Sequence, residues 1–344
     1  MIARTLLQDG LEISRLIKGG WHLAGGHGEV DHQRALSDMV EFVEAGITTF
    51  DCANIYTGVE QLIGDFRRSY PEHARHTQVF TKFVPDLGDL PTLDEPYVRR
   101  VIDTSLRRLG VERLDAVQFH WWDYSIPGYV EAAWALSRLR QEGKIARVSV
   151  TNFDVQRLQE LVNAGIPIST HQLQFSVLDS RPTKGMIDFC RKHRIDLLCY
   201  GTVAGGFLSE RWLGQAEPSD VLANRSLVKY KLIINDFGGW DLFQELLSAL
   251  KQIALKHHTD IASVATRVVL DQPGVAAAIV GATNTQHLPA HHTIQNLLLD
   301  DQDLAALAVI NDRKTDLGGD VYTLERDRHG KHGKIMRYEL TKSE

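Results

Sequence analysis

The chain has 344 residues, of which 43% are hydrophobic and 24% are charged. Both fractions are those of an ordinary globular protein, so they exclude disorder along the whole chain. The 44 acidic residues outnumber the 38 lysines and arginines, and the net charge of −6 makes nucleic acid and anionic membranes poor partners.

Cysteine use and hydropathy indicate a reducing, aqueous compartment. The three cysteines, Cys52, Cys190 and Cys199, form no C-x-x-C motif, which disfavours a disulfide framework or a cysteine zinc site. No apolar stretch approaches the roughly 18–20 residues that cross a bilayer, and the N-terminus lacks the pattern of a signal peptide. We therefore expect a cytoplasmic protein that has no membrane partner, and the oligomeric state stays open.

The chain opens with a predicted hairpin and continues as an alternation of strands and helices. Residues 5–13 alternate around Asp9-Gly10, a favoured two-residue turn. Short apolar runs predict strands at 17–19, 48–51, 79–82, 114–120, 147–151, 170–174, 196–200 and 276–280. Helical periodicity predicts helices at 31–45, 60–68, 95–109, 130–142, 155–164, 184–193, 240–258, 262–270, 285–294 and 300–310.

Eight strand–helix repeats favour a (β/α)8 TIM barrel with an N-terminal β-hairpin and extra C-terminal helices, as one domain over residues 1–344. An open doubly wound sheet is the alternative, but no G-x-G-x-x-G follows the first strand; the glycine-rich run at 25–28 lacks that spacing. Residues 202–239 form a long connection, which is typical of a lid or binding loop. Residues 313–344 form a polar tail that we expect over or beside the barrel mouth, or partly disordered.

Titratable residues end three consecutive predicted strands, where barrel enzymes carry their chemistry. These are Asp51, Lys82 and His120, and Tyr56 follows Asp51 by five residues. Lys82 can lower the pKa of the Tyr56 phenol, Asp51 can keep Lys82 protonated, and His120 can hydrogen-bond the reacting oxygen. The set would act as a general acid for a carbonyl oxygen, with a hydride supplied by a cofactor. Taken singly, each residue could equally be structural.

The segment GITTFDCANIYTGVEQLIGDF, residues 46–66, resembles the signature of the aldo-keto reductase superfamily. The later FTKF and VQFHWW carry the matching Lys82 and His120, and the resemblance extends over about residues 17–298. It implies a (β/α)8 barrel, an NAD(P)(H) cofactor and reversible interconversion of carbonyls and alcohols. It also implies that Asp51, Tyr56, Lys82 and His120 form a catalytic tetrad.

The resemblance further implies a cofactor site. VTNFDVQRL (150–158) resembles the segment that binds the nicotinamide carboxamide, GTVAGGFLS (201–209) the pyrophosphate loop, and VGATNTQHL (280–288) the adenosine loop. The residues implied are Trp21, Thr151, Asn152, Gln172, Tyr200, Gly201, Thr202, Val203, Gly206, Arg225, Gly281, Thr283 and His287. The adenosine loop lacks the Lys or Arg with which many relatives bind the 2′-phosphate, so NADP(H) is favoured by family usage alone and NAD(H) stays open.

Aromatic residues near the strand ends predict a pocket for an apolar or aromatic carbonyl compound. The candidates are Trp21, His22, Phe83, Trp121 and Trp122, with barrel-top core packing as the alternative interpretation. Two other functions stay open. One is a cofactor-binding regulatory module resembling channel β-subunits, suggested by GATN and by Ser226-Leu227. The other is a metal-dependent hydrolase, which the lack of a His-x-His at any strand end disfavours, so we expect no metal.

Overall fold

The computed structural model describes residues 1–25, 28–219, 222–281 and 283–340. Two residues of the glycine-rich run at 25–28, Ala282 of the predicted adenosine loop and residues 341–344 of the tail lie outside the described residues.

Eight parallel strands close into a barrel in the order β10-β3-β4-β5-β6-β7-β8-β9. The closing pair aligns Gly281 of β10 with Gly19 of β3. This confirms the predicted (β/α)8 TIM barrel. The strands are β3 (Leu16–Gly19), β4 (Thr49–Asp51), β5 (Gln78–Phe83), β6 (Ala116–Phe119), β7 (Val148–Thr151), β8 (Ile168–Gln174), β9 (Asp196–Tyr200) and β10 (Val275–Gly281).

The predicted hairpin is present and covers the floor of the barrel. β1 (Arg4–Leu6) pairs antiparallel with β2 (Glu12–Ser14), so the connecting loop spans five residues and the predicted two-residue turn is wrong. The reason is packing: Leu7 is only 2% exposed and joins the apolar cluster at the barrel floor. The backbone N–H of the next residue, Gln8, donates to Asp196 at 2.7 Å.

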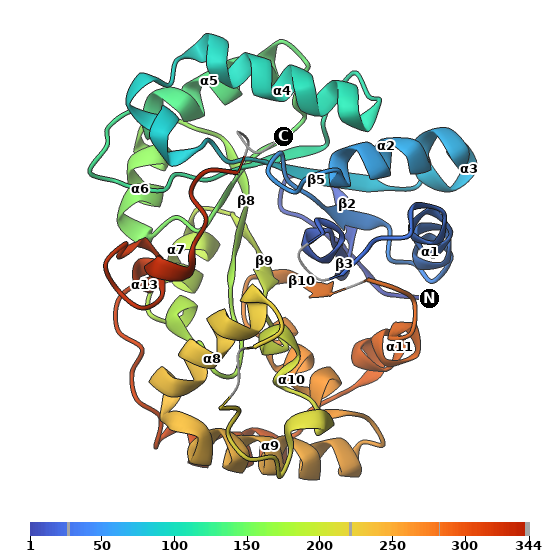
Figure 1. The fold of residues 1–344 in the computed structure, drawn as a ribbon, viewed down its shortest axis with the longest axis vertical. Coiled ribbons are helices and arrows are strands. Elements are labelled where there is room, and N and C mark those ends of the chain that lie inside the picture. Colours follow the sequence, from blue (N-terminus) through green and yellow to red (C-terminus); the bar gives the residue numbers. More distant parts are fainter. Residues whose placement is uncertain (26–27, 220–221, 282, 341–344) are drawn as a thin grey trace.

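Helices surround the strands on all sides (Figure 1). They are α1 (His32–Glu44), α2 (Val59–Ser69), α3 (Pro71–Ala74), α4 (Glu95–Leu109), α5 (Tyr129–Gln141), α6 (Val155–Asn163), α7 (Met186–Lys192), α8 (Arg225–Phe237), α9 (Gly239–Lys256), α10 (Ile261–Leu270), α11 (Leu288–Asn296), α12 (Asp301–Asn311) and α13 (Thr323–Arg326). Aspartates cap several of them: Asp94, Asp154 and Asp260 each accept a backbone N–H three residues on. The N-cap of α6 is therefore Asp154 and not Asn152. No helix in the described ranges is long and apolar enough to cross a membrane.

Predicted elements begin or end within about three residues of the observed ones, but three helices were missed. The most important is α8, which lies inside the predicted long connection. Its start is capped by Asn224, whose side chain accepts the Leu227 N–H at 3.0 Å. Its apolar face, Tyr230, Ile233, Ile234 and Phe237, is buried at helical spacing. The other two, α3 and α13, are single turns.

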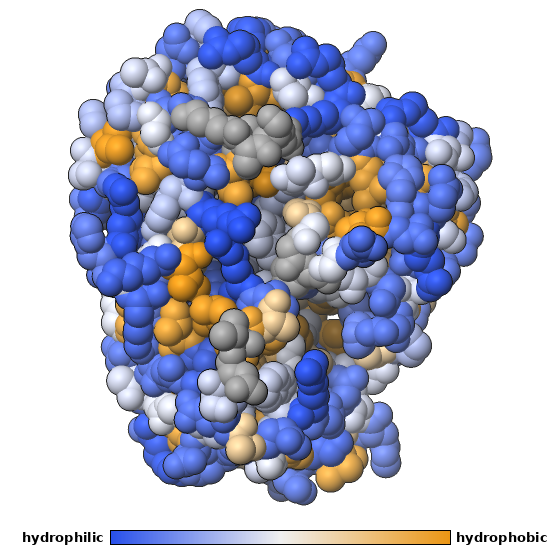
Figure 2. All heavy atoms as spheres, viewed as in Figure 1, coloured by the Kyte–Doolittle hydropathy of each residue, from blue (hydrophilic) through white to orange (hydrophobic). Residues whose placement is uncertain are grey.

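The C-terminal tail runs from α13 across the barrel mouth (Figure 1). The Tyr322 ring lies 5.4 Å from the His120 ring, and the Tyr338 ring lies 5.2 Å from the Trp122 ring. The Leu87 N–H donates to the Tyr338 carbonyl at 2.9 Å. Figure 2 shows the same face, with a hollow near its middle where apolar residues reach the surface among hydrophilic ones.

Candidate active site

A cavity of about 840 Å³ opens at the carboxyl ends of the strands. This size suits a small-molecule site. Every residue predicted for the tetrad and for the cofactor site lines it. The tail contributes further walls that sequence reasoning missed, since no periodic pattern marks them: Tyr322, Ile335, Met336, Arg337 and Leu340.

At the base of the cavity, Lys82 and Asp51 form a buried ion pair. The Lys82 ammonium donates to both Asp51 carboxylate oxygens, at 2.7 and 2.8 Å, and to the Cys52 carbonyl at 2.9 Å. Burial alone would lower the pKa of Lys82, but the Asp51 carboxylate outweighs burial and the pKa is raised. The ammonium is therefore charged at neutral pH.

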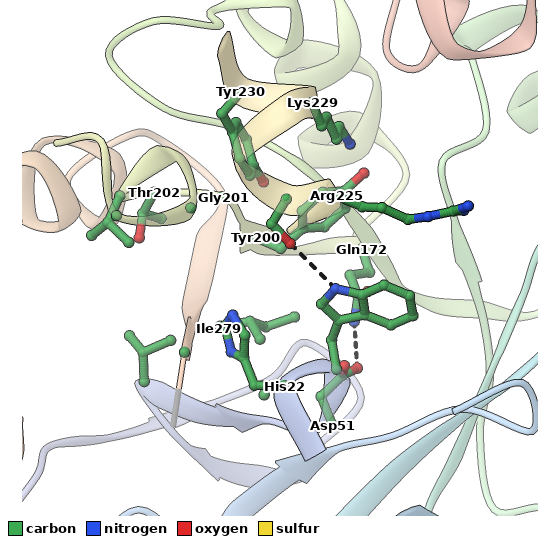
Figure 3. Close-up of a pocket in the computed structure, with 18 of the residues that line it drawn as sticks. His22, Asp51, Gln172, Tyr200, Gly201, Thr202, Arg225, Lys229, Tyr230 and Ile279 are labelled. Carbon is green, nitrogen blue, oxygen red and sulfur yellow. Dashed lines mark hydrogen bonds between the residues drawn. The ribbon is translucent and has the colours of Figure 1, made fainter. Parts of the chain in front are cut away.

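Two glutamine amides hold the Asp51 carboxylate from the other side. Gln172 donates to Asp51 Oδ1 at 2.6 Å (Figure 3), and Gln118 donates to the same oxygen at 3.1 Å. Gln118 was missed by sequence reasoning. The sequence nevertheless indicates this position. Gln118 precedes His120 by two residues in the predicted strand, and side chains two residues apart lie on the same face of a strand.

Tyr56 lies beside this ion pair. The Lys82 ammonium is 4.8 Å from the centroid of the Tyr56 ring, and the Trp21 ring packs edge-on at 5.2 Å. Burial raises the pKa of Tyr56 above that of a free phenol, and the Lys82 charge only reduces the rise. The expectation of a lowered pKa is therefore wrong in its net direction. A phenol with a raised pKa keeps its proton at neutral pH, as a proton donor must.

His120 faces the cavity as a neutral imidazole. Its Nδ1 donates to the Thr151 carbonyl at 3.2 Å, which assigns the proton to Nδ1 because a carbonyl only accepts. Burial first, and then the nearby Arg326 charge, hold the pKa of His120 well below its usual value. Nε2 is buried and has no partner among the described residues. It is placed to accept a hydrogen bond from a hydroxyl group in the cavity.

The predicted nicotinamide residues lie together at the ends of β7, β8 and β9. The Tyr200 hydroxyl donates to the Asn152 side chain at 2.9 Å. Asn152 has a φ of 62°, a left-handed conformation that asparagine tolerates better than most residues. From the opposite wall, Trp21 Nε1 donates to Ser226 on α8 at 3.3 Å, so α8 lies over this part of the cavity.

The predicted adenosine end is a close-packed wall. A Cβ at Gly281 would lie 2.7 Å from the His22 ring, so a larger residue there would require the His22 side chain to move. His22 lines the cavity against Gly281, away from Asp51 (Figure 3). His291 is 5% exposed, and its Nδ1 has no partner among the described residues. His120 and His291 both line the cavity, and each has a ring nitrogen without a partner among the described residues, which fits a ligand with several polar groups.

The prediction that Phe83 and Trp121 line the pocket is wrong. Both are 0% exposed and neither lines the cavity. Phe83 stacks on Phe119 at 5.7 Å, and Trp121 Nε1 donates to the Asp123 carbonyl at 3.0 Å. Each follows an inward-facing residue by one position, so each points outward into the layer between barrel and helices.

Trp122 lines the cavity as predicted, and it donates to the Pro85 carbonyl at 2.8 Å. We expect Trp122→Leu to raise the KM for a bulky carbonyl substrate several-fold. The matched change Phe83→Leu should leave KM unchanged and cost about 1–2 kcal/mol in the free energy of unfolding. Steady-state kinetics and denaturant titration of both variants measure this, and a KM effect of Phe83→Leu would contradict the assignment.

The part of the chain that the structure describes contains no group of three or more His, Cys, Asp or Glu side chains able to hold a metal ion. The paired histidines at 257–258 and 291–292 therefore do not assemble such a site with other described residues.

A closed parallel barrel whose strand ends carry charged and polar side chains into one cavity is the arrangement of a (β/α)8 barrel enzyme. The family model of the aldo/keto reductase family matches residues 15–312, and the chain belongs to that family.

Several relatives are oxidoreductases. Aldo-keto reductase YhdN of Bacillus subtilis (strain 168) is 25% identical, with 87% of this chain and 90% of the relative covered. An NADH-specific methylglyoxal reductase of Escherichia coli (strain K12) is 23% identical, with 85% and 93% covered. Flagellar radial spoke protein 5 of Chlamydomonas reinhardtii is 29% identical over 64% of this chain, and the match spans 49% of that protein. The solved structure of a Gluconobacter oxydans glycerol dehydrogenase shares the fold with a TM-score of 0.75 at 23% identity, with 88% of this chain and 93% of that chain covered.

Proposed function

We propose that the protein is an NAD(P)H-dependent reductase that converts aldehydes or ketones to alcohols in a reversible reaction. The observation that carries the proposal is the buried Asp51–Lys82 ion pair beside Tyr56, with the unpartnered Nε2 of His120 facing the same cavity. The bound nicotinamide would supply the hydride.

In this proposal each tetrad residue has one task. Tyr56 gives its proton to the carbonyl oxygen, and the charge on Lys82 stabilises the phenolate that remains. Asp51 keeps Lys82 charged and directed at Tyr56. After the proton has left Tyr56, the Nε2 of His120 can accept a hydrogen bond from the new alcohol hydroxyl and so hold the product in the cavity.

The cofactor would lie along the length of the cavity. Thr151, Asn152 and Gln172 would hold the nicotinamide carboxamide, because side-chain amides both donate and accept. Tyr200 would stack on the ring. The pyrophosphate would meet the loop of Gly201, Thr202, Val203 and Gly206, and the adenosine would meet Gly281, Thr283 and His287.

We favour NADP(H), with NAD(H) as the alternative. Arginines Arg211 and Arg225 line the cavity, and Arg225 extends from the start of α8 (Figure 3). Such cations suit the additional phosphate of NADP. The Escherichia coli relative is an NADH-specific methylglyoxal reductase, so the other preference also occurs among the relatives.

The substrate would be an apolar or aromatic carbonyl compound of small size. Around the tetrad the cavity is lined by Trp21, Trp122, Ile55 and Val84. All three cysteines are free and buried, which suits the cytoplasmic location that we propose.

Titration with NADPH and with NADH, followed by quenching of tryptophan fluorescence, tests the proposal. We expect saturable quenching by both, with the lower Kd for NADPH, because Trp21 borders the cavity. Turnover of aromatic aldehydes, read as loss of reduced cofactor, should follow. Cofactor binding without turnover of any carbonyl would instead favour the regulatory module. If neither cofactor binds, both the reductase and the regulatory module are contradicted.

A further inference from the structure

The C-terminal tail inserts one guanidinium, that of Arg326, behind the strand ends that carry His120 and Asn152. Arg326 Nη1 donates to the carbonyls of Trp121 and Trp122, the latter at 2.9 Å. Its Nη2 donates to the Asn152 carbonyl at 2.6 Å and to the Tyr124 hydroxyl at 2.7 Å. The two nitrogens of one planar group thus join the ends of β6 and β7.

These carbonyls belong to the segments that matter for the proposed reaction. Trp121 and Trp122 directly follow His120, and Asn152 directly follows Thr151, the partner of His120 Nδ1. Asn152 also has the left-handed φ of 62°. A charge-assisted bond to its carbonyl helps to hold this conformation, which presents the Asn152 amide to the cavity.

The charge of Arg326 has no carboxylate partner within the described residues. The guanidinium lies 3.9 Å from the centroid of the Tyr124 ring, and its Nε is buried without a hydrogen-bond partner. Removing a cation from water costs free energy unless surrounding polar groups replace the lost hydration. The compensation comes from three carbonyls, the Tyr124 hydroxyl and two aromatic rings, Tyr124 and Tyr322. The placement is therefore specific to a forked, planar cation.

We propose that Arg326 is a positioning residue of the active site, which fixes the backbone beneath His120 and Asn152 from a tail outside the barrel. The inference rests on the proposed function only for the expected fall in kcat. Its structural content concerns the geometry of β6 and β7 and the protonation of His120.

The groups that face His120 come from several elements. Asp51 on β4, Tyr56 in the loop after β4 and Lys82 on β5 line the same cavity, and Trp122 belongs to the His120 segment itself. Tyr322 and Arg326 belong to the tail. The Lys82 charge is paired with Asp51, whereas the Arg326 guanidinium forms no ion pair with a carboxylate among the described residues. The carboxylate that its charge reaches is Asp123, whose pKa it helps to lower. Arg326 is therefore the cation that adds to burial in keeping His120 neutral.

Two substitutions separate the geometry from the charge. In Arg326→Gln both are lost, so the pKa of His120 should rise, the Kd for NADPH should increase several-fold and kcat should fall tenfold or more. In Arg326→Lys the charge stays, but one ammonium cannot span both strand ends. The pKa of His120 should then stay low while kcat still falls. The control is Arg328→Gln, an exposed tail arginine 5.6 Å from the Tyr338 ring, which should change nothing.

The His120 pKa is read by NMR of the imidazole ring across a pH series, and cofactor Kd is read by tryptophan fluorescence. Neither reading needs turnover, so they test the inference even if no carbonyl substrate is reduced. A wild-type protein that never turns over would refute the proposed function alone. The inference is overturned if Arg326→Gln matches Arg328→Gln in His120 pKa, cofactor Kd and kcat. Should Arg326→Gln not fold, an Arg326→Lys protein with wild-type kcat and Kd would overturn it equally.

Discussion

Replacing Tyr56 with phenylalanine is expected to lower kcat for carbonyl reduction by about 10²- to 10⁴-fold, the usual contribution of a general acid. The change removes one oxygen atom and keeps the ring that packs against Trp21 and lies 4.8 Å from the Lys82 ammonium. The cofactor residues on β7 to β9 are untouched. We therefore expect the Kd for NADPH and the melting temperature to stay close to those of the wild type.

The measurements are steady-state kinetics with a saturating aldehyde and cofactor titration by fluorescence. Tyr70→Phe is the matched control, since Tyr70 packs on Phe66 at the end of α2, far from the cavity lining. The control should keep full activity. A Tyr56→Phe enzyme with wild-type kcat would remove Tyr56 from the role of proton donor.

The pH dependence of reduction distinguishes two states of this phenol. Because burial raises the pKa of Tyr56 despite the opposing Lys82 charge, the proton stays on the oxygen through neutral and mildly alkaline pH. The rate of reduction should therefore fall only above about pH 10, the ordinary pKa of tyrosine. A fall between pH 7 and 8 would mean that the lysine charge dominates, as the sequence alone suggested.

The sequence predicted the barrel well because each strand and helix has its own local pattern. The strands are short, continuous apolar runs, and the helices repeat apolar residues every three or four positions. The position of Asp51, Lys82 and His120 at strand ends then places them at one mouth. The errors at Phe83 and Trp121 came from proximity in sequence alone. Side chains alternate along a strand, so the neighbour of an inward-facing residue faces outward. Applied to this strand, the rule removes Trp121 from the predicted site and adds Gln118.

The tail could not be placed in this way. Its contacts with the mouth come from single residues that follow no periodic pattern. Arg326 donates to backbone carbonyls more than 170 positions away, and the Tyr322 ring packs against the His120 ring. The pKa of Tyr56 escaped prediction for a similar reason. Burial is set by the assembled cavity, and the sequence shows only which charge lies nearby.

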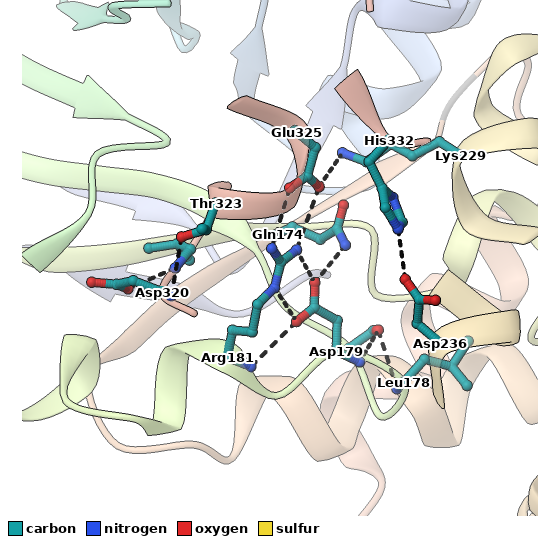
Figure 4. Close-up of polar contacts among 12 residues, drawn as sticks. Gln174, Leu178, Asp179, Arg181, Lys229, Asp236, Asp320, Thr323, Glu325 and His332 are labelled. Atoms are coloured by element: carbon teal, nitrogen blue, oxygen red, sulfur yellow. Dashed lines mark hydrogen bonds and ion pairs between the residues drawn. The ribbon is translucent and has the colours of Figure 1, made fainter. Parts of the chain in front are cut away.

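Replacing Glu325 with glutamine is expected to cost about 3–5 kcal/mol in the free energy of unfolding, the usual loss when one partner of a buried ion pair is removed. Glu325 on α13 meets Arg181 at 3.2 Å and Lys229 of α8 at 3.5 Å, and its side chain is 0% exposed (Figure 4). Arg181 keeps a second partner, Asp179, at 2.7 Å. Lys229 loses its carboxylate, so it carries most of the penalty. Denaturant titration of both proteins gives the difference.

The same carboxylate makes this difference depend on pH. Burial alone would raise the pKa of Glu325, but Lys229 and then Arg181 hold it at about 2, below the 4.5 of a free glutamate. A folded-state pKa below the unfolded value stabilises the fold above pH 4.5, and this contribution is lost as the pH falls toward 2. The gap between wild type and Glu325→Gln should therefore be full at pH 7 and shrink below pH 4.5. Glu245→Gln, which breaks an exposed pair with Arg313, should show little change at any pH. If the difference in free energy of unfolding is the same at pH 7 and pH 3, the Glu325 charge does not stabilise the contact between the tail and α8.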